Sequence, residues 1–212
     1  MLEHAMPTTE SRVAPEKVSE QIERWLAGDG DKTLGGLIDV FQEKSFAVIF
    51  ILLLGVPALP LPTGGATHVF EIIAMLVALQ LVAGRDKIWL PQRWRKVELG
   101  TGGGRTRFIK GLMKAIRWIE RFSRPRLRLL FDHRASNSVF GLLVIAGSLG
   151  AFLAPPFSGL DTLPALGVVL LSLGVLLEDF ALVVLALIVG GVGILLEVVL
   201  GKAAVRGIAN IF

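Results

Sequence analysis

The 212-residue chain has no cysteine, which excludes a disulfide framework, a thiolate nucleophile and a cysteine-ligated metal site. Charged residues are also scarce, at 19% of the chain against 53% hydrophobic residues. This balance is too apolar for a soluble domain of such size. We therefore expect an integral membrane protein.

Catalytic and cofactor-binding motifs are missing as well. The three histidines, His4, His68 and His133, have no second histidine at helical spacing, so no metal site is expected. Neither a nucleophile-elbow motif nor a phosphate-binding loop occurs, and we interpret the glycine-rich run 100–105 as a flexible linker. The sequence thus favours a protein that is not an enzyme and holds no cofactor.

The cations are distributed unevenly. Fifteen of the 22 Lys and Arg residues lie between Arg85 and Arg134, against four acids there. Such a segment should face the cytoplasm and meet anionic lipid headgroups rather than nucleic acid. The first 17 residues lack an apolar segment behind a basic start, so no cleavable signal peptide is expected.

The stretch 55–85 contains a proline and glycine break between two short apolar runs. The runs 46–59 and 69–83 are separated by Pro60, Pro62 and the glycine pair at 64–65. Each run would rise about 21 Å as a helix, short of the roughly 30 Å hydrocarbon core. A broken helical hairpin follows, either re-entrant or built from short tilted spans.

Two amphipathic helices are expected outside the apolar runs. One extends from Pro15 to Gly28 and should lie on the membrane or on the rest of the protein. The other covers 108–122, with an apolar face opposite four cations, and should lie in the cytoplasmic interface until Pro125 ends it.

The first hairpin recurs at a constant offset of 94 residues. Five pairs match in type or role: Phe46 with Phe140, Pro62 with Pro156, Gly65 with Gly159, Thr67 with Asp161, and Arg85 with Asp179. Because the segment between the copies is too charged to cross a bilayer, both hairpins enter from the same side. The repeats should therefore be parallel, related by an axis along the membrane normal.

The predicted fold is an all-α integral membrane protein with two parallel-repeated broken hairpins and an interfacial amphipathic helix. The final apolar run, interrupted by Gly190, Gly191 and Gly193, could cross once or turn back, which leaves the side of the C-terminus open. The expected segments are a polar N-terminus (1–32), a first hairpin (33–84), a basic cytoplasmic segment (85–135), a second hairpin (136–179) and a C-terminal membrane segment (180–212).

A candidate anion or lipid site lies at the first break, at Thr63, Gly64, Gly65 and Thr67. A helix that starts there would point free N–H groups and a positive dipole end into the membrane. The alternative is that the two threonines and buried backbone groups satisfy the break without any ligand.

His68 and Glu71 lie one helical turn apart just after the break. Charged groups at that depth are costly, so a proton or cation path is one interpretation. A structural ion pair is the other, and the second copy has Ala165 in place of Glu71.

Arg85 and Asp179 end the second helix of each hairpin. Parallel repeats would place both at the cytoplasmic boundary, where we expect them to pair or lie close, joined by Glu178. The alternative is that each extends separately into water.

Several short motifs resemble one known family. They are Pro60-Leu61-Pro62, Ala78-Leu79-Gln80 before Gly84-Arg85, Trp89-Leu90-Pro91, Pro156-Phe157, and Leu163-Pro164-Ala165-Leu166 before Asp179. These residues resemble the ExoD-type exopolysaccharide synthesis proteins of bacterial inner membranes, over roughly residues 33–200. The resemblance implies an inner-membrane protein that affects exopolysaccharide production, with a link to tolerance of alkaline conditions, and it supplies no catalytic residues.

Two departures from the family pattern occur, at Val56-Pro57 and at Glu71-Ile72-Ile73. A role for Glu71 would therefore belong to this protein rather than to the family. Three functional classes stay open: transport of an envelope precursor, lipid or ion; an accessory subunit of a larger membrane complex; and a membrane-embedded enzyme. The small residues Gly147, Gly150 and Ala151 would also allow packing between copies.

Overall fold

The computed structural model describes residues 17–28, 32–60, 67–85, 87–99, 103–121, 123, 134–155 and 158–209. These residues are helical, without a strand, as expected for an all-α chain. The described elements are α1 (Val18–Ala27), α2 (Leu34–Phe41), the 3-10 turn η1 (Gln42–Lys44), α3 (Ser45–Leu54), α4 (His68–Val82), α5 (Gln92–Arg95), α6 (Gly103–Glu120), α8 (Arg134–Leu153), α9 (Thr162–Leu176) and α10 (Phe180–Ala209).

Local sequence explains where several of these helices begin and end. The Thr33 hydroxyl accepts a hydrogen bond from the Gly36 N–H at 3.2 Å, so Thr33 caps the start of α2. The α3 helix ends at Leu54, three residues before the buried Pro57. Proline has no backbone N–H to donate, and its ring would clash with the carbonyl four residues earlier if the helix continued. Gly28 ends α1 as expected.

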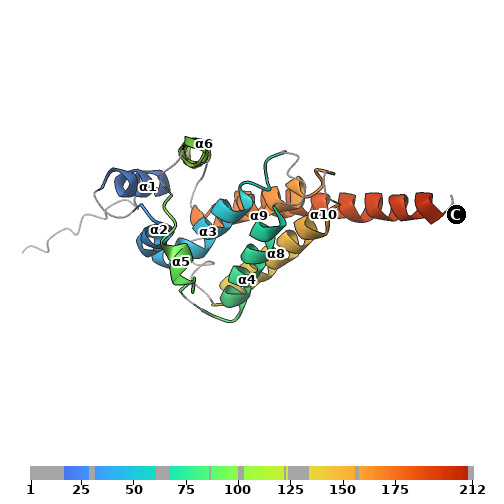
Figure 1. Cartoon of the computed structure of the whole chain (residues 1–212), viewed down its shortest axis with the longest axis horizontal. Coiled ribbons are helices and arrows are strands. Elements are labelled where there is room, and N and C mark those ends of the chain that lie inside the picture. Colours follow the sequence, from blue (N-terminus) through green and yellow to red (C-terminus); the bar gives the residue numbers. More distant parts are fainter. Residues whose placement is uncertain are drawn as a thin grey trace, which may run out of the picture.

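Helices α3, α4, α8, α9 and α10 form the apolar bundle (Figure 1). The first helix of each hairpin packs against the second helix of the other, so α3 contacts α9 and α4 contacts α8. Two helices, α8 and α10, contain stretches long and apolar enough to cross a membrane, at 135–153 and 180–203. The three others are shorter apolar helices.

The second helices of the two hairpins match in extent and in their ends. Helix α4 starts at His68 and α9 at Thr162, and both contain 15 residues, so start and end lie 94 residues apart. Each is followed by a residue with positive φ, Gly84 at 79° and Glu178 at 55°. The next N–H in each chain segment bonds a carbonyl five residues earlier, at 3.1 and 2.8 Å, which is a Schellman-type ending.

Helix α10 is one continuous helix through its three glycines, which excludes a turn back at that point. A Cβ on Gly167 of α9 would lie 2.5 Å from the Gly190 Cα of α10. A Cβ on Gly193 would lie 2.6 Å from the ring of Pro164. The backbones of α9 and α10 therefore touch, while the end of α10 extends beyond the rest of the bundle (Figure 1).

The amphipathic helices α1 and α6 pack on each other beside one end of the bundle. Glu120 of α6 accepts hydrogen bonds from the Ser19 N–H at 3.0 Å and from the Ser19 hydroxyl. A carboxylate thus occupies the N-terminal end of α1, where free N–H groups and the helix dipole favour it. A second contact joins Arg117 to Glu23 at 3.0 Å.

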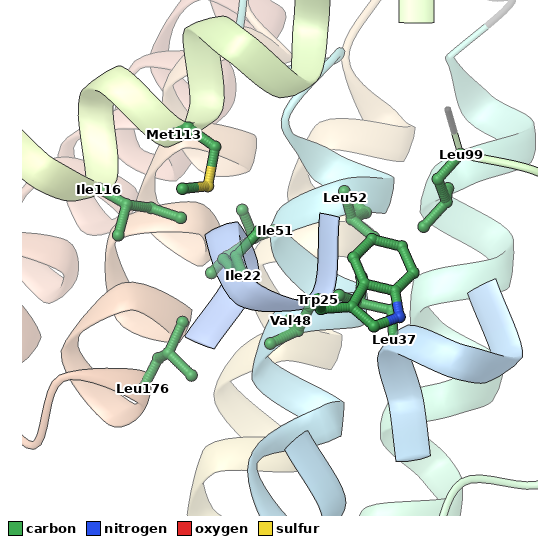
Figure 2. Close-up of a pocket in the computed structure, with 10 residues that line it drawn as sticks. All are labelled: Ile22, Trp25, Leu37, Val48, Ile51, Leu52, Leu99, Met113, Ile116 and Leu176. Atoms are coloured by element: carbon green, nitrogen blue, oxygen red, sulfur yellow. The ribbon is translucent and has the colours of Figure 1, made fainter. Parts of the chain in front are cut away.

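The apolar faces of α1 and α6 are covered by the protein itself. Met113 and Ile116 of α6 are buried and, with Ile22 of α1 and Ile51 of α3, surround a small apolar pocket (Figure 2). Its volume of about 30 Å³ is far too small for an acyl chain. Of the two placements expected for α1, the structure has the one on the protein, and α6 begins at Gly103, inside the run expected to be a linker.

The exit from α4 is fixed by a polar clamp. The Gln80 side chain accepts from the Trp89 N–H at 2.9 Å and donates to the Trp89 carbonyl at 3.2 Å. Arg95 of α5 bonds both carboxylate oxygens of Asp39 at 3.0 Å. These bonds hold the segment 87–99 against α2. They also give Gln80, a polar residue in the apolar helix α4, a structural partner.

Gly167→Ala should destabilise the bundle because the added methyl group would meet the Gly190 backbone, which has no flexible side chain to move aside. We expect a loss of about 1–3 kcal/mol of unfolding free energy, the usual cost of overpacking. Unfolding by denaturing detergent in mixed micelles measures it.

Gly191→Ala is the matched control, since nothing lies within 4 Å of its added Cβ. This change should leave stability equal or slightly higher, because alanine favours helix over glycine. Equal stability of the two variants would contradict the close contact of α9 and α10.

Candidate functional site

The candidate site begins with a contact between His68 and the buried Glu71 at the start of α4. The His68 Nδ1 lies 2.7 Å from the Glu71 Oε2, and the Glu71 side chain is 0% exposed. The His68 ring also stands edge-on to Phe152 of α8, with ring centroids 5.1 Å apart. The structure therefore brings together the two residues expected to share a helix face, inside an apolar environment.

Two further carboxylates belong to the same end of the bundle. Asp161 directly precedes α9, and Glu197 projects from α10 toward α8, where its Oε2 would lie 3.5 Å from a Cβ on Gly150. Glu71, Asp161 and Glu197 all interact electrostatically with one another. We call these three carboxylates and His68 the tip cluster.

The tip cluster gathers residues from three separated helices. Sequence alone does not connect Glu197 with Glu71, because they are 126 positions apart and only the packing of α10 brings them together. A usable signal did exist, since Glu197 is the sole acid between 180 and 209 in an apolar helix. The sequence pattern identifies Asp161 only as a helix-capping residue type.

The tip cluster does not resemble a metal centre. Within the described residues, no group of three or more His, Asp or Glu side chains is placed to hold a metal ion. Its carboxylates are near enough to feel one another's charge without forming such a ligand set.

The candidate anion site is only partly visible. Thr63, Gly64 and Gly65 lie outside the described residues. Thr67 is buried, 2% exposed, and precedes α4 without capping it through its side chain. Its hydroxyl instead interacts with the Glu71 carboxylate.

The opposite end of the bundle holds the expected Arg85 and Asp179. Arg85 is exposed, whereas Asp179 is buried and accepts from the Ala181 N–H at 2.8 Å, capping α10. The pairing of Arg85 with Asp179 stays a prediction.

Glu178, expected to join that pair, has a different partner. Its carboxylate lies 2.7 Å from the Lys44 ammonium, which also donates to the Leu176 carbonyl at 3.3 Å. This cation stands at the C-terminal end of α9, where the helix dipole favours it.

Exposed cations line the outer side of α6. Lys110, Lys114 and Arg121 are exposed there, beside an exposed Trp118. An aromatic and several cations on one surface are typical of contact with a membrane interface. Because the protein covers Met113 and Ile116, contact with lipid would use this polar and aromatic side.

Comparison with known proteins points to one family. Residues 18–199 match the family described as "Exopolysaccharide synthesis, ExoD". The chain is 30% identical over 183 residues to "Uncharacterized protein slr1875" of Synechocystis sp. (strain ATCC 27184 / PCC 6803 / Kazusa), covering 84% of this chain and 80% of that protein.

A second relative carries the family name. The chain is 29% identical over 153 residues to "Protein ExoD" of Rhizobium meliloti (strain 1021), covering 69% of this chain and 61% of that protein. No solved structure matches the chain significantly. The resemblance drawn from the sequence motifs is confirmed by these matches.

His68→Phe should destabilise the protein by about 3 kcal/mol, because the buried Glu71 carboxyl group would lose the His68 ring as a hydrogen-bond partner. The double change His68→Phe with Glu71→Leu should cost less than the sum of the two single changes. A double-mutant cycle of unfolding free energies measures this coupling. Strict additivity would show that the pair is not energetically linked.

Proposed function

The chain belongs to the ExoD family of exopolysaccharide synthesis proteins, and we propose that it acts in the bacterial inner membrane by moving an envelope precursor, a lipid or an ion. The observation that carries this proposal is the fully buried Glu71 in contact with His68 in an apolar bundle. Ionisable residues at membrane depth are costly and commonly mark the path of a substrate or ion.

An ion is the favoured cargo at this site. Glu71 stands in the first turn of α4 and Asp161 just before α9, so carboxylates already occupy the positive ends of both helices. An anionic group bound near Thr67 would meet their repulsion. Protection of residues 63–70 from hydrogen exchange by a phosphate-bearing lipid would nevertheless restore the anion-site proposal.

A parallel repeat would suit such a function, since many transporters consist of repeated halves. In support of it, α4 and α9 have equal lengths, starts 94 residues apart and the same helix ending. The cross-packing of α3 with α9 and α4 with α8 is what a twofold axis between the hairpins would produce. The two halves would then enclose the tip cluster between them.

The alternative function is that of an accessory subunit in a larger membrane complex. Two surfaces favour it: the exposed side of α6, and α10, of whose apolar stretch only 11% is buried. A second copy of the chain could cover α10 equally well. Both surfaces would otherwise face headgroups and lipid chains, which is the arrangement proposed for a lone transporter.

Glu71→Gln should abolish proton movement through the purified protein in sealed vesicles, because an amide cannot exchange a proton with His68. A pH-sensitive dye inside the vesicles, under an imposed potential, measures the flux. Glu20→Gln, an exposed glutamate of α1, is the matched control and should keep full flux.

Equal flux in wild type and Glu71→Gln would remove the proton path. Wild-type flux no higher than that of empty vesicles, together with a stoichiometric companion on purification, would favour the accessory role.

The absence of cysteine makes single-cysteine labelling a clean test of orientation. We propose that α8, whose 20 residues rise about 30 Å, crosses fully, so that the hairpins are short spans. Lys110→Cys should then react with an impermeant maleimide from the cytoplasmic side, and Ser158→Cys from the opposite side. Labelling of both from the cytoplasmic side would instead indicate re-entrant hairpins.

A further inference from the structure

Apart from Arg134 at the start of α8, the ionisable residues within the apolar helices lie toward one end of the bundle. No Asp, Glu, His, Lys or Arg occurs in α3, in α9 or in α8 after Arg134. The ionisable residues within α4 are His68 and Glu71, and those of α10 before Arg206 are Glu197 and Lys202. Of these residues, His68, Glu71 and Glu197 belong with Asp161 to the tip cluster.

Two carboxylate oxygens of the tip cluster and one hydroxyl of α8 have no hydrogen-bond partner in the described part of the chain. The Glu71 Oε1 and the Glu197 Oε1 are buried without a hydrogen bond, and so is the hydroxyl of the fully buried Ser148. Ser148 precedes Phe152 by one helical turn on α8, and Phe152 contacts His68, so this hydroxyl lies on the face turned to α4. Buried acceptors and donors of this kind normally have a partner, and a bound proton would supply one donor.

Charge balance points to the same ligand. When ionised, Glu71, Asp161 and Glu197 would carry three negative charges, and the tip cluster contains no Lys or Arg to balance them. Keeping several like charges in a desolvated site is costly, and a carboxylate commonly escapes this cost by binding a proton. Because the described residues offer no ligand set for a metal ion, a bound proton is the simpler neutralisation.

The two hairpins contribute to the site from different positions of the repeat. Glu71 aligns with Ala165, whereas Asp161 aligns with Thr67, so the second hairpin has its carboxylate one helical turn earlier. Either half alone would hold one carboxylate, and α10 adds a third. The site therefore exists only when α4, α9 and α10 are packed together.

We propose that Glu71, Asp161 and Glu197 form one shared proton-binding site, in which Glu197 exchanges the proton with the outer side of the membrane. Glu197 is 17 residues beyond Phe180, or about 25 Å along α10, which places it near the far edge of the hydrocarbon core. The proposal deepens the proposed function and rests on it, because it names the proton as the ion and adds two residues to the path.

Infrared titration of the full-length protein in lipid vesicles, without any gradient, tests the site directly. The C=O stretching band of a protonated carboxyl group should be present at neutral pH and should disappear as the pH is raised. Glu197→Gln should remove part of this band. Asp161→Asn should change the pH midpoint of what remains, because one neighbouring charge is lost. Glu20→Gln should change neither quantity.

The absence of a titrating band in the wild type would overturn the proposal, and so would identical titrations of the wild type, Glu197→Gln and Asp161→Asn. Thermal unfolding of each variant checks that it is folded. If Glu197→Gln does not fold, the titration of Asp161→Asn still tests the site. Flux assays separate this inference from the proposed function. A C=O band that responds to both substitutions, without wild-type flux, would support the proton-binding site and reject transport. Wild-type flux, with a band that neither substitution changes, would support transport and reject the shared site.

Discussion

The contact between the backbones of α9 and α10 determines most of the arrangement around the tips. Gly167 and Gly190 allow the two helices to touch, and Gly193 extends the contact to Pro164 at the start of α9. Without this close approach, the Glu197 carboxylate could not lie beside Gly150 of α8. One steric condition, the lack of side chains along a stripe of α10, thus decides whether Glu197 reaches the tip cluster.

Much of the fold could be predicted because it depends on local sequence. Gly28 and Pro57 end helices through their own backbone properties. The apolar periodicity of α1 and α6 predicts which face of each helix is buried. The positions of α4 and α9 also followed from pattern. The pair of His68 and Glu71 could be predicted for the same reason, since both belong to one helical turn.

The remaining features depend on which helices become neighbours, and helix pairing cannot be predicted from the periodicity of a single sequence. Glu197 joins the tip cluster only through the packing of α10. Lys44 reaches Glu178 only because α3 packs against α9. The amphipathic pattern of α6 likewise fits a lipid surface or a protein surface, and the contacts of Met113 and Ile116 show that protein covers part of it.

The helices of this bundle differ greatly in length. Helix α4 has 15 residues and rises about 22 Å, whereas the apolar stretch of α10, residues 180–203, has 24 residues and rises about 36 Å. A bilayer of one thickness cannot match both, so the lipid beside the hairpins must thin, or α10 must tilt, at a modest cost per ångström of hydrophobic mismatch. The protein would then deform the membrane around it, and a change in membrane thickness would act on the helix ends that carry the tip cluster.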